Sequence, residues 1–116
     1  MSSTHASQRR VVITGMGILS PLGVGVDDAG PNLMAGKSGI GKIDLLDYSA
    51  APQNVGGEVR GFNDKYFRGL VPKKQRKVVG MMCREIQLGA ASAILALEHS
   101  QVDLDDWTLK FDLPKA

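Results

Sequence analysis

The sequence predicts an α/β fold, and two features of its pattern support that prediction. Residues 11–13 form a continuous β-branched run without polar alternation, which is typical of a strand buried on both faces. From about Pro72 to Ser100, apolar residues recur at helical spacing on two faces, which indicates one long buried helix. A doubly buried strand needs parallel neighbours, and the chain offers too few other strand candidates. We therefore expect the fold to be incomplete in this chain.

The first part of the chain is predicted to alternate loops with short elements. Residues 1–8 are small and polar and are expected to form a disordered leader, with residues 9–116 as one domain. After the strand at residues 11–13 comes a loop. A short helix is then expected to stop at Gly36, with Asp27 or Asp28 as its cap and Gly30 and Pro31 in its first turn.

The middle of the chain is expected to be irregular, with short strands and one helical turn. Strands are predicted at residues 43–46 and 55–59, and a single helical turn at residues 63–67. After the long helix, a further strand is predicted to begin near Thr108.

Composition and charge exclude several classes of protein. The 116 residues have a formal net charge of only +2, so general attraction to nucleic acid or to a membrane surface is not implied. No apolar run approaches the roughly 20 residues that a membrane span needs. Cys83 is the single cysteine, which excludes an intramolecular disulfide and a thiolate cluster for zinc. We expect a cytoplasmic protein without a metal or any other cofactor.

Two glycine-rich stretches resemble nucleotide-binding motifs without meeting their requirements. Gly36-Lys37-Ser38 matches the end of a P-loop, but Pro31 stands where that loop needs a glycine and removes an N–H donor. Gly15 and Gly17 match the start of a dinucleotide-binding fingerprint, but Ser20 stands at the third glycine position. The sequence therefore predicts no nucleotide site, and Lys37 is expected to be a solvated side chain.

Residues with nucleophilic or acid–base chemistry are few and scattered. Cys83 falls inside the predicted long helix, where we expect a buried structural thiol. His5 lies in the leader, and His99 lies at the end of the long helix, where an imidazolium suits the helix dipole. We therefore predict no catalytic residue in this chain.

A basic run begins the predicted long helix and contains Lys73, Lys74, Arg76 and Lys77. Cations at a helix N-terminus oppose the helix dipole at a cost of a few tenths of a kcal/mol each. Two interpretations stay open: a solvated charged turn, or a docking site for an acidic partner. Nucleic acid is disfavoured as the partner because no aromatic residues interleave with the cations.

Three segments in a fixed order resemble a known family. They are RRVVITGMGILSPLG at residues 9–23, LMAGKSGI at residues 33–40 and GGEVRGFN at residues 56–63. Together they resemble the opening of β-ketoacyl-[acyl carrier protein] synthases, and the resemblance extends from about Arg9 to Leu104. It implies the N-terminal part of a thiolase-like fold with αβαβα layers. Residues 29–32, Ala-Gly-Pro-Asn, depart from the bulky aromatic residues usual in the family.

The resemblance implies an acyltransferase that condenses acyl thioesters with malonyl-carrier protein by decarboxylation. It places the family's nucleophilic cysteine and two histidines further along than Ala116, so this chain alone is predicted inactive. It also implies acyl carrier protein as the partner, bound through Lys73, Arg76 and Lys77, and a homodimer for the complete protein. A stand-alone carrier-protein-binding module and a chain-length-factor-like partner subunit remain alternatives, as do fatty-acid and polyketide synthesis.

Overall fold

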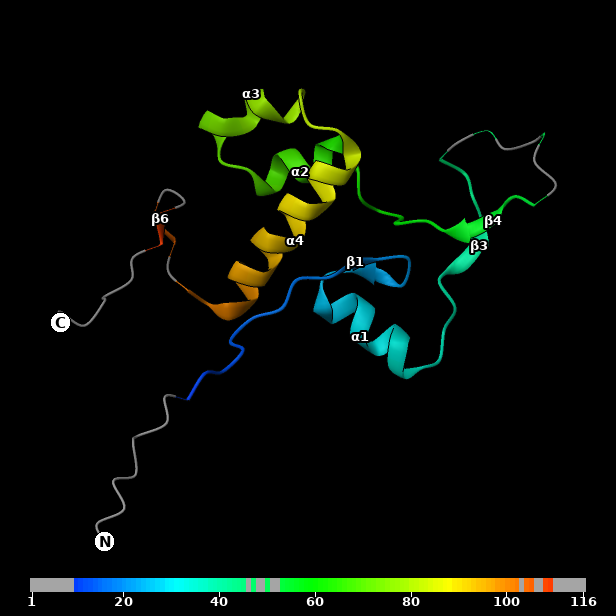
Figure 1. The fold of residues 1–116 in the computed structure, drawn as a ribbon, viewed down its shortest axis with the longest axis horizontal. Coiled ribbons are helices and arrows are strands. Elements are labelled where there is room, and N and C mark those ends of the chain that lie inside the picture. Colours follow the sequence, from blue (N-terminus) through cyan, green and yellow to red (C-terminus); the bar gives the residue numbers. More distant parts are fainter. Residues whose placement is uncertain are drawn as a thin grey trace, which may run out of the picture.

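The computed structural model describes residues 10–45, 47, 50, 53–102, 104–105 and 108–109. The predicted leader at residues 1–8 lies outside this part of the chain. Among the described residues, helices alternate with three antiparallel two-stranded ladders (Figure 1). The ladders pair β1 (Leu19–Ser20) with β2 (Gly23–Val24), β3 (Ile40–Lys42) with β4 (Val55–Gly57), and β5 (Leu104–Asp105) with β6 (Thr108–Leu109). The strand expected near Thr108 is thus present as β6.

The strand predicted at residues 11–13 is not formed, and this part of the prediction is wrong for the structure. Residues 10–18 are extended without ladder hydrogen bonds, and Val11 and Ile13 are 93% and 86% exposed. The physical reason is that no other strand among the described residues lies beside this segment to pair with its backbone. A β-branched run favours the extended conformation, but a strand also needs a partner.

Two glycines hold the N-terminal segment against the last helix, α4 (Arg84–Ser100). A Cβ atom on Gly15 would overlap the carbonyl oxygen of Ala96, and one on Gly17 would overlap that of Ser92. The segment crosses the C-terminal half of α4, shown in orange in Figure 1. These glycines therefore serve close backbone packing and do not bind a pyrophosphate.

Helix α1 (Val26–Met34) confirms the predicted short helix but begins differently. Its cap residue is Gly25, whose φ of 87° lies in the region that favours glycine, while Asp27 and Asp28 lie in the first turn. Pro31 lies inside the helix and not in the first turn, so the prediction for it was wrong. The chain leaves the helix at Gly36, which has a φ of 65°, as predicted.

The first strand of the β3–β4 ladder lies slightly earlier in the chain than predicted, while the second begins at Val55 as predicted and ends at Gly57. Its register pairs Ile40 with Gly57 and Lys42 with Val55, so the first strand falls at residues 40–42 instead of 43–46. Arg60 secures the end of the ladder by donating to the carbonyl oxygen of Lys42 at 2.6 Å and approaching Glu58 at 3.3 Å. Burial raises the pKa of Glu58, but backbone N–H donors and Arg60 outweigh this effect and lower the pKa below its usual value.

The predicted single helical turn is a longer helix, α2 (Asp64–Leu70). It begins at Asn63, whose side-chain oxygen accepts a hydrogen bond from the backbone N–H of Tyr66 at 2.9 Å. The core of the described residues gathers around this helix and α4. Its buried members are Phe62, Phe67, Val71, Val79, Ala91 and Ile94.

The predicted long helix is broken into three elements. They are the 3₁₀ turn η1 (Lys73–Gln75), the short helix α3 (Arg76–Val79) and α4. The break at residues 80–83 is stabilised by buried Gln87, whose amide nitrogen donates to the carbonyl oxygen of Met82 at 3.2 Å and to a carboxylate oxygen of Asp64 at 2.9 Å. A side chain that bonds to carbonyl groups at a break offsets the loss of helical hydrogen bonds there.

Candidate functional site

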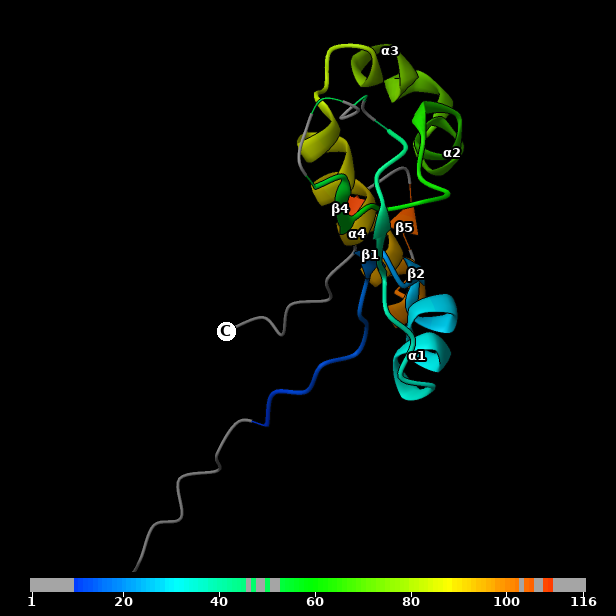
Figure 2. The same ribbon diagram turned by 90° about the vertical axis from the view of Figure 1, so that its right-hand side faces the viewer.

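The basic run lies on η1 and α3, at the end of the molecule formed by the helices. Both views place α3 at the top, outside α2 and the start of α4 (Figures 1 and 2). Lys73 and Lys77 are exposed, and Arg76 is half-buried. Arg76 is therefore less accessible to solvent than the two lysines near it in the sequence. We use "basic strip" for Lys73, Arg76 and Lys77, the three residues predicted as the partner site.

Arg76 faces inward and holds the basic strip in place. Its guanidinium donates to the carbonyl oxygen of Val71 at 3.1 Å, which closes the turn before η1. Arg68, on α2, in turn donates to the carbonyl oxygen of Arg76 at 3.4 Å. Arg68 also lies 3.9 Å from Asp64, in a pair exposed enough to contribute little to stability. Arg76 therefore positions the strip, while the two lysines are its accessible charges.

The break in the long helix changes the electrostatics predicted for the strip. Lys73 lies in a 3₁₀ turn, and Arg76 and Lys77 lie in a helix of four residues. A full helix dipole is not aligned behind these cations, so the predicted dipole cost does not apply. Sequence reasoning missed Arg68, although the cap at Asn63 predicts a helix that brings this residue toward the strip.

Cys83 does not occupy the buried position that was predicted for it. It is exposed and serves as the cap residue of α4, because the helix breaks just before it. The pKa of the neighbouring Glu85 is lowered by its own backbone N–H and then by a hydrogen bond from the Cys83 side chain. The thiol thus contacts a carboxylate at the start of α4.

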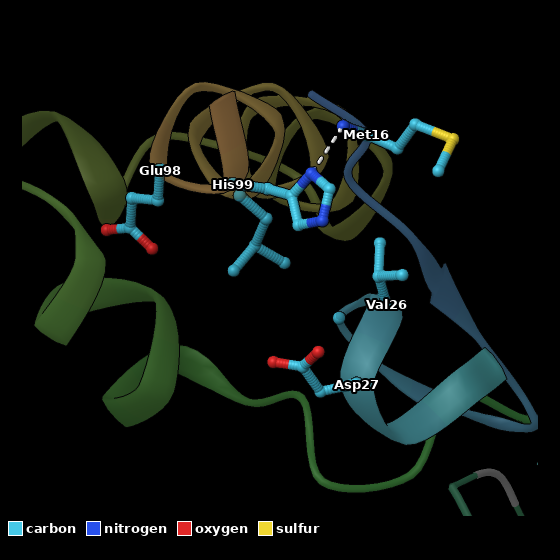
Figure 3. Close-up of a pocket in the computed structure, with 7 residues that line it drawn as sticks. Met16, Val26, Asp27, Glu98 and His99 are labelled. Carbon is cyan, nitrogen blue, oxygen red and sulfur yellow. Dashed lines mark hydrogen bonds between the residues drawn. The ribbon is translucent and has the colours of Figure 1, made fainter. Parts of the chain in front are cut away.

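His99 lies in a small cavity between the N-terminal segment, α1 and α4 (Figure 3). Its Nδ1 atom accepts a hydrogen bond from the backbone N–H of Met16 at 3.2 Å. The bond joins the N-terminal segment to the end of α4. His99 therefore has a structural role in the described fold.

The cavity beside His99 does not contain the groups that nucleophilic catalysis requires. It has a volume of about 260 Å³, and its other polar side chains are the carboxylates of Asp27 and Glu98. Cys83 and His99 lie at opposite ends of α4, about 24 Å apart at 1.5 Å per residue, so they cannot form a Cys–His pair. The prediction that this chain has no catalytic residue stays a prediction.

The glycine-rich corner at residues 35–40 does not have the geometry of a P-loop. Strand β3 follows Ser38 where a P-loop would begin a helix. Lys37 is exposed, as expected, and its Nζ atom donates to the side-chain oxygen of Asn32 at 2.8 Å. Asn32 in turn donates to the carbonyl oxygen of Leu22 at 2.7 Å. Lys37 therefore joins a local network that braces α1 against the β1–β2 turn.

Neither a metal centre nor a membrane-crossing helix is found in the part of the chain that the structure describes. Within the described ranges, no three His, Cys, Asp or Glu side chains gather closely enough to hold a metal ion. None of the described helices is both long and apolar enough to cross a membrane.

Comparison with known proteins identifies the class to which this architecture belongs. Residues 8–109 match the family of the β-ketoacyl synthase N-terminal domain. The chain belongs to this family, which confirms the resemblance seen in its sequence.

Particular relatives are 3-oxoacyl-[acyl-carrier-protein] synthases. The chain is 37% identical over 100 residues to synthase 2 of Vibrio cholerae, covering 86% of this chain and 23% of that protein. It is 47% identical over 58 residues to the chloroplastic synthase I of Hordeum vulgare, covering 50% of this chain and 13% of that protein. The chain thus spans about a quarter, or less, of the length of these relatives.

A solved structure shows the same likeness in three dimensions. The ishigamide ketosynthase/chain length factor superimposes with a TM-score of 0.67 at 34% identity, over 84% of this chain and 23% of the other. This likeness confirms the predicted fold class, the N-terminal part of a thiolase-like α/β fold.

Proposed function

We propose that this chain is the N-terminal part of a β-ketoacyl synthase, which condenses acyl thioesters with malonyl-acyl carrier protein in fatty-acid or polyketide synthesis. The observation that supports this proposal is the family match over residues 8–109, together with relatives named as synthases acting with acyl carrier protein. The chain alone is proposed to be inactive. The distance between Cys83 and His99 along α4 supports that view.

We propose that the basic strip docks acyl carrier protein. Lys73 and Lys77 are exposed on η1 and α3, so they can approach an acidic surface. Arg76 contributes by holding the turn through Val71. Exposed charges of this kind mainly accelerate association and orient the partner, and each adds a modest free energy.

The experiment that tests docking compares two charge reversals of equal size. Lys77→Glu is expected to weaken binding of acyl carrier protein about fivefold at low salt, because a favourable contact becomes a repulsive one. Lys42→Glu, on the exposed face of β3, makes the same charge change away from the strip and serves as the control. Titration calorimetry of the purified chain measures both dissociation constants.

The salt dependence of the loss distinguishes local contact from general attraction. Screening is expected to shrink the effect of Lys77→Glu at high salt, since the Debye length falls to about 3 Å at 1 M. Equal behaviour of the two variants would overturn docking at the strip. Arg76 is unsuitable for this comparison because replacing it also removes the hydrogen bond to Val71.

The complete protein is proposed to be a homodimer located in the cytoplasm. A single cysteine in the chain supports a reducing compartment. The solved neighbour is named a ketosynthase/chain length factor, and no feature of the described residues favours the chain-length-factor role over the synthase. The synthase is therefore the function that we propose.

A further inference from the structure

We propose that Val78 and Met81 form the apolar half of the carrier-protein docking surface, and that they receive an apolar side chain from an acidic amphipathic helix of the partner. The proposal rests on the proposed function, because it assigns further residues to the same surface. The contact made by Val78 and Met81 differs from those of the basic strip, because salt does not screen an apolar contact.

The local backbone places these two side chains beside the lysines. The chain forms a continuous series of helical turns from Lys73 to Met82, because Met81 N–H donates to the Val78 carbonyl oxygen at 3.0 Å after α3 ends. Val78 follows Lys77 directly, and Met81 lies four residues after Lys77, one turn further along. The exposed apolar side chains therefore lie next to an accessible cation.

The burial of neighbouring residues shows which side faces outward. Val79 is fully buried, and the half-buried guanidinium of Arg76 donates to Val71 on the inner side. In contrast, Val78 is 44% exposed and Met81 is 80% exposed. Val79 thus contributes to the described core, whereas the side chains of Val78 and Met81 remain exposed. Exposed apolar groups next to charges are typical of surfaces that bind a partner.

Charge complementarity selects the partner. The apolar pair lies at the end of a strip whose accessible charges are positive, so an approaching surface needs carboxylates along one line and an apolar group beyond them. An acidic amphipathic helix presents that arrangement at helical spacing. A second copy of the same surface is disfavoured, because Lys73 and Lys77 of two copies would repel each other.

The experiment uses Met81→Gln, which keeps the length of the side chain and makes its end polar. Met34→Gln is the matched control, because Met34 is 87% exposed on α1, away from the strip. Binding of acyl carrier protein to each purified chain is measured by surface plasmon resonance at low and high salt. Met81→Gln is expected to raise the dissociation constant about fivefold at both salt concentrations, through faster dissociation.

The outcomes separate this inference from the proposed function. If Met81→Gln binds like Met34→Gln while Lys77→Glu weakens binding, the apolar contact is refuted and docking at the strip stands. If neither Met81→Gln nor Lys77→Glu changes binding, the docking function itself is refuted. A loss in Met81→Gln that vanishes at high salt would also contradict the proposal, since an apolar contact is not screened.

Discussion

Gly17 allows the N-terminal segment to lie directly against the backbone of α4. A Cβ atom at this position would overlap the carbonyl oxygen of Ser92, which is fixed within a helix and cannot turn aside. Any side chain therefore forces the segment away from the helix. The contact with His99 at Met16 lies next to it, so the two depend on the same close approach.

We expect Gly17→Ala to lower the free energy of unfolding by about 2 kcal/mol through this steric overlap. Gly89→Ala is the matched control, because Gly89 lies in α4 and an added Cβ there meets no atom within 4 Å. The control is expected to stabilise the chain by about 0.5–1 kcal/mol, since alanine favours helix. Urea unfolding followed by circular dichroism measures both, and equal effects would contradict the packing assigned to Gly17.

The element that sequence reasoning placed least well is the long helix. Gly36 is a local signal that correctly indicated the end of α1, and the helical turn predicted at residues 63–67 marked the start of α2. The break before Cys83 depends on Gln87 reaching Asp64, 23 residues earlier in the chain. A pattern of apolar residues contains no information about such a distant hydrogen bond. The periodicity therefore predicted one helix where the structure has three elements.

The candidate site shows the same division between local and distant information. The exposure of Lys73 and Lys77 follows from their charge, and the sequence predicted it. The inward position of Arg76 depends on its contact with Val71 and on the turn that precedes η1. Sequence reasoning assigned Lys73, Arg76 and Lys77 together as docking residues. The structure instead makes Arg76 a positioning residue.

Gln87→Leu is expected to destabilise the chain by about 2–3 kcal/mol. The change removes the donor for the carbonyl oxygen of Met82 and for Asp64. Leaving these acceptors unsatisfied destabilises the chain more than the apolar side chain of leucine stabilises it. Gln75→Leu, at an exposed position in η1, is the control and should change stability by no more than about 0.5 kcal/mol. Thermal unfolding measures the stability of both variants. A Gln87→Leu variant as stable as Gln75→Leu would show that the break has another cause.

At the scale of the whole molecule, the described part has a small core and many exposed large apolar side chains. The exposed run Val11–Ile13 is the clearest case, because its side chains and its unpaired backbone are accessible together. Extended apolar segments with free backbone groups pair with other chains. The relatives are about four times as long, so their remaining residues are one source of such a partner.

We expect the isolated chain to self-associate through this run, and Val12→Lys to reduce the association, since Val12 is 69% exposed within it. Met34→Lys introduces the same charge at an exposed position on α1 and is the control. Sedimentation velocity over a range of concentrations measures the average mass of each variant. Val12→Lys and Met34→Lys chains of equal mass at every concentration would show that association uses another surface.

The hydrogen bond between Met16 and His99 also has a consequence for synthesis on the ribosome. Its two residues are 83 positions apart, so the N-terminal segment is made well before the helix against which it packs. At about 5–20 residues per second, translation needs roughly 4–17 s to add the intervening residues. During that interval the segment around Gly15 and Gly17 has no helix to pack against. The contact between the N-terminal segment and α4 is therefore expected to form only after nearly all of the described residues have been made.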